Sequence, residues 1–445
     1  MRTEAPTAVG TRAIPSAATV IAGSDSGDVT LLVSTRDVLD RSGVAWLILR
    51  GPAEANDRCQ EIDILVEPDS MAVIKAALRP LGFRETLEPG RGSHRFLVAY
   101  DAVQDRWLKL DLVDEVAVGP VHEVPIAGAR QVLARRARSD GFPVLSQGDE
   151  LWAMLLHRVG DRRAGGGVRR LQAEQVRRMA VNADPSSPLA RSFDGVSPTG
   201  RWGDRSLSGP AAAIDLARRG QIDDLARMTR AAINSRRNAG LDAAARSARH
   251  AARRVVRRLR STITFPARPG GAIVVLLGPD GAGKSGLAAA LCRDTPLPVR
   301  RRYLGLYGAA GPRPVFGSGG IGRLWWVVRA SAAAWLDRRR GRIVVFDRYV
   351  DDIRSARGPK SRLRRAMYRT VAVRPDVLLV LDAPGETLHA RRPEHTAIEA
   401  ERDRRRYLAM AAHRPEATVI DATRSPANVA AAAQSVLWTW LSTRA

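Results

Sequence analysis

The chain has 445 residues, a length that predicts two or three domains, each large enough for its own hydrophobic core. Its 71 Lys and Arg residues outnumber 46 Asp and Glu, which gives a net charge of +25, while aromatic residues make up only 5% and two cysteines occur. These values exclude a disulfide-stapled scaffold and argue against a base-stacking platform for nucleic acid. Because the excess charge is almost wholly arginine, we attribute it to a solvated surface and expect no nucleic-acid partner.

The first residues and the overall hydrophobicity bear on where the protein acts. Residues 1–28 are rich in Ala, Thr, Ser and Gly without periodicity, which predicts a disordered tail. The apolar piece Ala17–Ala22 is too short for a signal peptide, and no uncharged run reaches the roughly 18 residues of a membrane span. We therefore expect a soluble, cytoplasmic protein.

Acidic residues occur on two strands that the sequence predicts near the N-terminus. The predicted elements are a helix over 31–40, a strand over 45–50 that ends at Gly51-Pro52, a strand over 61–66, a helix over 70–81 and a strand over 107–113. Residues two apart on a strand face the same side, so Glu61 and Asp63 project together, and Asp111 can approach from a neighbouring strand. Three convergent carboxylates predict a site for one or two Mg²⁺ ions.

This order of elements resembles the nucleotidyltransferase superfamily of the DNA polymerase β type, over residues 29–135. The resemblance implies that Glu61 and Asp63 are the metal-binding pair, that Asp111 is the third carboxylate, and that residues 29–182 form an α+β nucleotidyltransferase-like domain with a helical extension. Pro52 lacks the N–H that the family's small residue offers to phosphate at this position. The alternative is a domain that is retained for binding or scaffolding.

Residues 183–268 are predicted to connect two domains. Asp184–Pro210 is rich in Pro, Ser and Gly, which is typical of a linker, and Ala211–Arg260 is helix-forming. Its last part, 246–260, is a basic helix with a thin apolar stripe. That helix is interpreted first as a solvated connector, with weak contact to an anionic membrane surface or to nucleic acid as alternatives.

The strongest motif of the chain is a phosphate-binding loop. Gly278-Pro-Asp-Gly-Ala-Gly-Lys-Ser285 follows an apolar β-branched run, 273–277, and precedes an Ala- and Leu-rich helix, which is the context that a P-loop requires. Its glycines let backbone N–H groups and a helix N-terminus surround phosphate oxygens. Lys284 would reach the β- and γ-phosphates, and the Ser285 hydroxyl would bind Mg²⁺. We predict that the chain binds a nucleoside triphosphate.

Strands and helices alternate from residue 269 to the C-terminus. A predicted helix over 324–340 is followed by a strand over 342–349, a strand over 376–382, a helix over 386–391, a strand over 418–421 and a terminal helix from Pro426. Such alternation predicts right-handed βαβ units and a parallel α/β sheet with flanking helices.

Together these motifs resemble thymidylate kinase, of the P-loop nucleoside-monophosphate kinase fold, from Gly271 to the C-terminus. The resemblance rests on the P-loop, Phe346-Asp-Arg-Tyr349, the strand 376–382 and an arginine-rich stretch over 391–407. It implies a kinase that uses ATP and Mg²⁺. The implied ATP, metal and acceptor residues are Gly278, Asp280, Gly281, Ala282, Gly283, Lys284, Ser285, Asp347, Arg348, Asp421 and Arg424. Arg391, Arg392 and Arg402 of the arginine-rich lid would neutralise charge on the transferring group.

Individual roles also follow from this resemblance. Asp280 would meet a sugar hydroxyl of the acceptor, Asp347 would help to hold Mg²⁺ and Arg348 would bind the acceptor phosphate. Arg348, at the carboxyl edge of a strand beside the P-loop strand, is in addition a natural bidentate phosphate ligand on chemical grounds. Asp421 and Arg424 would lie beside the adenine.

The acceptor itself is left open by the sequence. The thymine-reading element that thymidylate kinases carry after Asp-Arg-Tyr is replaced here by Val350-Asp-Asp352, an acidic pair that favours hydroxyl groups. A nucleoside monophosphate or a related phosphate acceptor is expected. A sugar or small-molecule kinase on the same fold and a non-enzymatic ATP-dependent switch are the alternatives.

Overall fold

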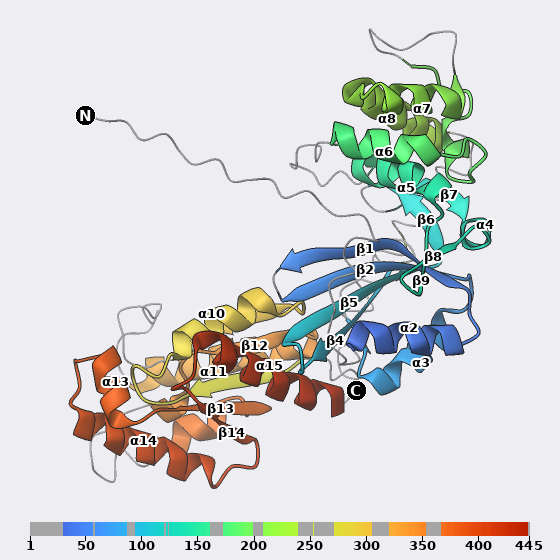
Figure 1. Cartoon of the computed structure of the whole chain (residues 1–445). Helices are drawn as coiled ribbons and strands as arrows, with labels where there is room; N and C mark the ends of the chain where they lie inside the picture. Colours follow the sequence, from blue (N-terminus) through green and yellow to red (C-terminus); the bar gives the residue numbers. More distant parts are fainter. Residues whose placement is uncertain are drawn as a thin grey trace, which may run out of the picture.

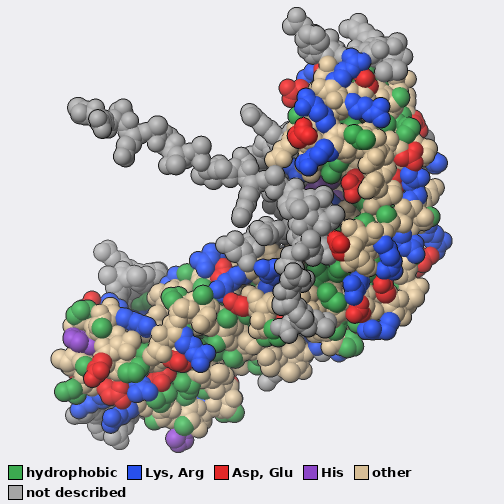
Figure 2. Space-filling model, viewed as in Figure 1, with side chains coloured by type: hydrophobic (Ala, Val, Ile, Leu, Met, Phe, Trp, Pro, Cys, Tyr) green, Lys and Arg blue, Asp and Glu red, His purple; other side chains and the backbone are tan. Residues whose placement is uncertain are grey.

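The computed structural model describes residues 30–56, 58–86, 94–119, 122, 124–160, 172–198, 208–238, 252, 271–304, 320–352 and 366–443. The expected tail (1–28) and the basic helix (246–260), apart from residue 252, lie outside these residues. Three parts follow one another along a bent molecule: a central mixed sheet, a helical unit at one end and a parallel α/β unit at the other (Figure 1). The space-filling view shows the same bend, with Lys and Arg side chains spread over the visible face (Figure 2). None of the described helices is both long enough and apolar enough to cross a bilayer.

The central part is a seven-stranded sheet with the order β3-β4-β5-β2-β1-β9-β8. Its elements are α2 (Leu31–Arg41), β1 (Trp46–Asn56), β2 (Cys59–Val66), α3 (Met71–Leu78), β3 (Arg84–Glu85), β4 (Arg95–Asp101), β5 (Arg106–Val113), β8 (Ala137–Ser139) and β9 (Phe142–Val144). Strand β2 pairs antiparallel with β1 and parallel with β5, so that Asp63 lies opposite Asp111. The acidic positions of two strands that are distant in sequence therefore meet in one register.

Strand β1 is longer than predicted. It continues through Gly51-Pro52 to Asn56, with register shifts against β2 on both sides of Arg50. A bulge of this kind lets a strand pass a proline, which has no N–H to give to the ladder. The expected strand end at Gly51 was therefore wrong.

The second part packs helices on the far end of this sheet. A short hairpin, β6 (Glu115–Val118) and β7 (Val124–Gly128), and α4 (Ala129–Leu133) lead into the helices α5 (Gln147–Gly160), α6 (Ala173–Asn182), α7 (Gly209–Arg218) and α8 (Ile222–Asn238). Their apolar faces share one hydrophobic core with Leu47 and Leu65 of the sheet.

Part of the segment that was expected to be a linker belongs to this helical core. Leu189 and Phe193 are fully buried, and the short 3₁₀ helix of Ala190–Phe193 lies between the longer helices. The Phe193 ring packs 5.2 Å from that of Trp152 on α5. The linker interpretation of 184–198 was wrong, because its Pro- and Ser-rich composition hides a few large apolar residues that the helices cover.

The third part is a five-stranded parallel sheet with the order β11-β12-β10-β13-β14, as expected for a chain of βαβ units. Its elements are β10 (Ile273–Leu277), α10 (Lys284–Asp294), β11 (Val299–Arg302), α11 (Gly320–Arg339), β12 (Ile343–Phe346), β13 (Val377–Asp382), α13 (Gly385–Arg391), α14 (Ala397–Ala411), β14 (Ala417–Asp421) and α15 (Pro426–Thr443). Strand β10 is buried throughout, with helix-packed cores on both faces of the sheet.

Helix α15 joins the parallel unit to the central sheet (Figure 1). Leu437 packs into the core of the parallel unit, whereas Trp438 packs into the core under β4 and β5. The Trp438 ring meets Trp107 of β5 edge to face at 5.1 Å, and the indole N–H of Trp107 donates to the amide oxygen of Gln434. The last helix of the chain thus completes the core of a sheet formed near its beginning.

Candidate functional site

The loop after β10 has the backbone of a phosphate-binding loop. Gly278, Gly281 and Gly283 all have positive φ, at 144°, 88° and 91°, a region that residues with a side chain rarely adopt. A Cβ atom on Gly278 would lie 2.7 Å from the carbonyl oxygen of Leu381 on β13. Glycine is therefore required there both for the turn and for the close approach of the neighbouring strand.

Lys284, the first residue of α10, is 5% exposed and folds back over this loop. Its Nζ donates to the carbonyl oxygens of Gly278 and Pro279 at 2.7 and 2.8 Å, and lies 3.7 Å from a carboxylate oxygen of Asp280. These contacts hold the buried ammonium directly over the loop, where a bound phosphate would lie.

Ser285 and Asp347 come together across the edge of the sheet. The Ser285 Oγ donates to both carboxylate oxygens of Asp347, at 3.0 and 3.1 Å, and Asp347 follows directly after β12. A hydroxyl and a buried carboxylate at this spacing supply hard oxygen ligands of the kind that Mg²⁺ takes beside a nucleotide phosphate. The donor set therefore fits the expected metal.

Asp280 and Arg348 are also brought to this edge. Arg348 donates from Nη2 to Asp280 at 2.8 Å, and Nε2 of His395 lies 3.7 Å from the other oxygen of Asp280. Three segments therefore meet at the Asp280 carboxylate: the P-loop itself, Arg348 after β12, and the segment before α14. The two residues that were expected to contact the acceptor thus contact each other in this structure.

Of the three arginines expected in the lid, Arg392 lies beside the loop, and Arg391 and Arg392 make local contacts. The Cβ of Arg392 lies 3.5 Å from the position that a Cβ on Gly281 would take, so the end of α13 packs against the P-loop. Arg391 donates to the carbonyl of Ala422 at 2.9 Å, and Arg392 pairs with Glu394 at 3.2 Å. Arg402 lies on the exposed side of α14.

Asp421 and Arg424 sit where β14 ends, at the same carboxyl edge of the sheet. Hydrogen bonds from Thr423 are the main cause that lowers the pKa of Asp421, and Arg424 adds a contact at 3.3 Å. Because β13 and β14 are in register at Asp382 and Asp421, this turn borders the loop after β13.

Sequence reasoning missed three charged residues at this edge. Arg301 of β11 makes a close ion pair with Asp347, and Arg404 of α14 binds both oxygens of Asp382 at 2.7 and 3.0 Å. Arg301 lies in a run of three arginines, 300–302, and nothing in that run shows which of them reaches the edge. The acid at the end of β13 was a usable signal for a basic partner.

One acidic residue that was linked to the acceptor is occupied elsewhere. The side chain of Asp351 is fully buried and pairs with Arg369 at 2.7 Å and with Arg414 at 3.0 Å. Asp351 cannot at the same time bind acceptor hydroxyls. It therefore gives no support to a sugar acceptor. The interpretation of Asp351 as an acceptor ligand was wrong.

Replacing Asp351 by asparagine should destabilise the protein by about 2–3 kcal/mol, because two guanidinium groups lose their shared buried charge. The measurement is urea unfolding followed by circular dichroism, with the exposed pair residue Glu394→Gln as a control that should change by less than about 0.5 kcal/mol. Unchanged stability together with a weaker affinity for the acceptor would return Asp351 to the acceptor site.

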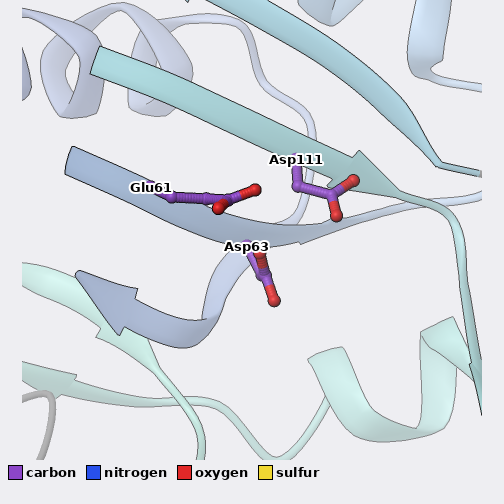
Figure 3. A group of neighbouring side chains, drawn as sticks. All are labelled: Glu61, Asp63 and Asp111. Atoms are coloured by element: carbon purple, nitrogen blue, oxygen red, sulfur yellow. The ribbon is translucent and has the colours of Figure 1, made fainter. Parts of the chain in front are cut away.

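The second cluster of candidate residues lies on the central sheet. Glu61 and Asp63 on β2 and Asp111 on β5 each place a carboxylate oxygen within 4.8 Å of the others (Figure 3). Asp63 and Asp111 are opposite each other in the parallel ladder, and Glu61 lies one pleat along the same face. The three predicted carboxylates therefore converge, and their chemistry and spacing suit a divalent cation.

Basic side chains that the sequence did not single out surround these carboxylates. Lys109 pairs with Glu61 at 2.8 Å, Arg50 with Asp63 at 2.6 Å, and His94 with Asp111 at 2.7 Å. Burial raises the pKa of Asp63 to about 6, against the opposing effect of Arg50. Lys109 was detectable in sequence, because it precedes Asp111 by two residues and faces the same side of β5.

The comparisons with known proteins find a likeness among solved structures only. No protein-family model matches the chain, and no curated protein matches it. Among solved structures, deoxyadenosine kinase from M. mycoides with bound dATP aligns over 37% of this chain and 98% of its own, with 12% sequence identity and a TM-score of 0.27. The same enzyme with bound dCTP aligns over the same shares, with 13% identity and a TM-score of 0.26. The chain is a mixed α/β protein whose C-terminal unit is a parallel sheet with flanking helices and a P-loop at its carboxyl edge.

Proposed function

We propose that the C-terminal unit binds ATP with Mg²⁺ and transfers the γ-phosphoryl group to a small acceptor. The observation that carries this proposal is the arrangement around the P-loop: Lys284 is buried over the loop, and Ser285 is hydrogen-bonded at 3.0 Å to Asp347, just after the neighbouring strand. This combination of a buried ammonium, a hydroxyl and a carboxylate supports phosphoryl transfer rather than simple anion binding.

Each residue has a separate task in such a transfer. The loop N–H groups and the N-terminus of α10 hold the phosphates, and Lys284 neutralises charge that develops on the transferred group. Ser285 and Asp347 would hold Mg²⁺, which supplies electrostatic stabilisation when bound. Arg348 is placed to orient an anionic acceptor, which requires that it exchange Asp280 for the acceptor's phosphate.

The acceptor that this geometry favours is a nucleoside monophosphate or a related phosphate. Arg348 offers a guanidinium at the carboxyl edge of β12, beside the strand that carries the P-loop. Because Asp351 is buried in its own ion pairs, the Arg348 guanidinium rather than Asp351 indicates the chemistry of the acceptor. A sugar acceptor remains an outcome of the experiment below.

The test uses the whole chain with γ-labelled ATP and Mg²⁺, and offers nucleoside monophosphates and a set of sugars as acceptors. Label on a nucleoside monophosphate supports the proposal in full. Label on a sugar keeps the reaction and changes the acceptor. Tight ATP binding without any labelled acceptor contradicts phosphoryl transfer and favours a nucleotide-dependent switch.

Asp347→Asn should lower the transfer rate about a hundredfold and weaken metal binding, because an amide is a poorer ligand for Mg²⁺ than a carboxylate. The readout is the rate as a function of Mg²⁺ concentration, together with Mn²⁺ binding in the presence of ATP measured by electron paramagnetic resonance. Asp215→Asn on α7, remote in the helical unit, is the control and should change neither quantity. An unaltered metal dependence would remove Asp347 from the metal site.

A second candidate function is nucleotidyl transfer at the carboxylates of the central sheet. The observation that favours it is the convergence of Glu61, Asp63 and Asp111 within 4.8 Å. Asp63→Asn should reduce Mn²⁺ binding to this sheet about tenfold or more in an Asp347→Asn background, in which metal binding beside the P-loop is already weakened, and should abolish any transfer of label from α-labelled ATP. Lys109 and Arg50 offset much of the negative charge of the three carboxylates and thereby oppose cation binding. If the parent protein binds no Mn²⁺ at this sheet, this function is contradicted.

A further inference from the structure

Helix α11 presents an unusual outer surface, which we call the α11 face and define by Trp325, Val328, Trp335 and Leu336. These side chains are 44%, 45%, 42% and 37% exposed, and they are four of the ten large apolar residues exposed within the described part of the chain. Their spacing of three, seven and one residues places them along one side of the helix. Large exposed apolar side chains that gather on one side of a helix, rather than occurring singly, indicate an interaction surface.

Arginines frame this strip. The guanidinium of Arg329 lies 5.6 Å from the ring centre of Trp325 and 5.4 Å from that of Trp326, and that of Arg339 lies 4.8 Å from Trp335. The lone acidic residue of the helix, Asp337, is buried and pairs with Arg302 and Arg342 on the inner side. The outer side of α11 is therefore apolar and positively charged.

The combination of tryptophan and arginine on one surface indicates the chemistry of the partner. Indole rings favour the boundary between water and lipid chains, and arginine side chains lie along apolar surface while the guanidinium reaches anionic headgroups. We propose that the α11 face docks the protein on an anionic phospholipid surface, with both tryptophans in the headgroup region.

A second copy of the chain fits this face less well. Two α11 helices face to face would bring like charges together around Arg329 and Arg339, with no exposed acid on either helix to offset them. The exposed apolar area of four partly exposed side chains is on the order of a few hundred Å², short of the ~800 Å² per partner of a standard interface. An anionic lipid surface avoids both difficulties, because its negative charge complements the arginines and it does not need the area of a standard protein–protein interface.

The proposal is tested on the full chain with vesicles of phosphatidylcholine alone and of phosphatidylcholine mixed with phosphatidylglycerol. We expect co-sedimentation with the anionic vesicles only, with a blue shift of tryptophan fluorescence. The double variant Trp325→Ser/Trp335→Ser should lose about tenfold or more in apparent affinity. Arg329→Gln/Arg339→Gln should weaken binding mainly at low salt.

The matched control is Ile398→Ser, since Ile398 is an apolar residue of α14 that is 81% exposed but lies outside the α11 face. It should bind vesicles as the parent does, and all variants should keep their circular dichroism spectrum and ATP turnover. Binding that survives the double tryptophan variant would place any membrane contact elsewhere and overturn the proposal. So would equal binding to neutral vesicles, or a parent dimer that the double variant converts to a monomer.

Discussion

Replacing Lys284 by alanine is expected to lower the rate of phosphoryl transfer about a thousandfold, because the developing charge on the γ-phosphoryl group loses a cation in a site that excludes much of the water. Lys284 is the residue on which the proposed function depends most directly, since its Nζ lies over the loop at 2.7 Å from the Gly278 carbonyl. The measurement is single-turnover transfer from γ-labelled ATP at saturating acceptor. The affinity for ATP, measured by titration, should fall by a smaller factor than the rate.

The sequence offers a clean control for this experiment. Lysine occurs only four times in the chain, and Lys75 is an exposed residue of α3 that pairs with Glu85 on the surface. Lys75→Ala should leave the transfer rate unchanged. If Lys284→Ala retained the parent rate while folding normally, phosphoryl transfer at this loop would be excluded.

Replacing Trp107 by alanine is expected to lower the free energy of unfolding by about 3–5 kcal/mol, the cost of emptying a large buried aromatic site. Trp107 is fully buried between Tyr100, Trp438 and Gln434, so its loss affects the central sheet and its contact with α15 together. The removal of its indole N–H also leaves the buried amide of Gln434 without a donor. Chemical denaturation followed by circular dichroism measures the effect.

A double-mutant cycle separates packing across the interface from packing within the sheet. Trp107→Ala and Trp438→Ala should be coupled by about 1 kcal/mol, as expected for an edge-to-face aromatic pair. Trp335→Ala, on the exposed side of α11, is the matched control and should cost less than about 1 kcal/mol. Additive effects of Trp107 and Trp438 would mean that the two rings contribute no specific coupling between α15 and the sheet.

The P-loop and the carboxylate cluster could be predicted because their signals are local or strictly periodic. The P-loop needs glycines at positive φ between a buried strand and a helix, and all of these features lie within a few residues of Gly278. The meeting of Asp63 with Asp111 follows from the alternation of strands once β2 and β5 are neighbours. Their roles in catalysis remain predictions that the experiments above address.

Features that depend on distant parts of the chain were not predictable in the same way. The burial of Leu189 and Phe193 is decided by the helices around them, and composition alone indicated a linker. The partners of Asp351 are 18 and 63 residues away, so an exposed acid and a buried ion pair look alike in sequence. Arg301 and Arg50 became visible as partners of Asp347 and Asp63 only when neighbouring strands fixed which side chains lie together.

The hydrogen bond between Trp107 and Gln434 joins residues 327 positions apart, and this separation has a consequence for synthesis of the protein. A ribosome that adds roughly 5–20 residues per second needs about 15–60 s to proceed from one to the other. During that interval β4 and β5 stand without the helix that covers them, with aromatic surface open to chaperones or to other nascent chains. Shortening the delay, by a circular permutation that places α15 before β4, should therefore raise the yield of folded protein made at high temperature.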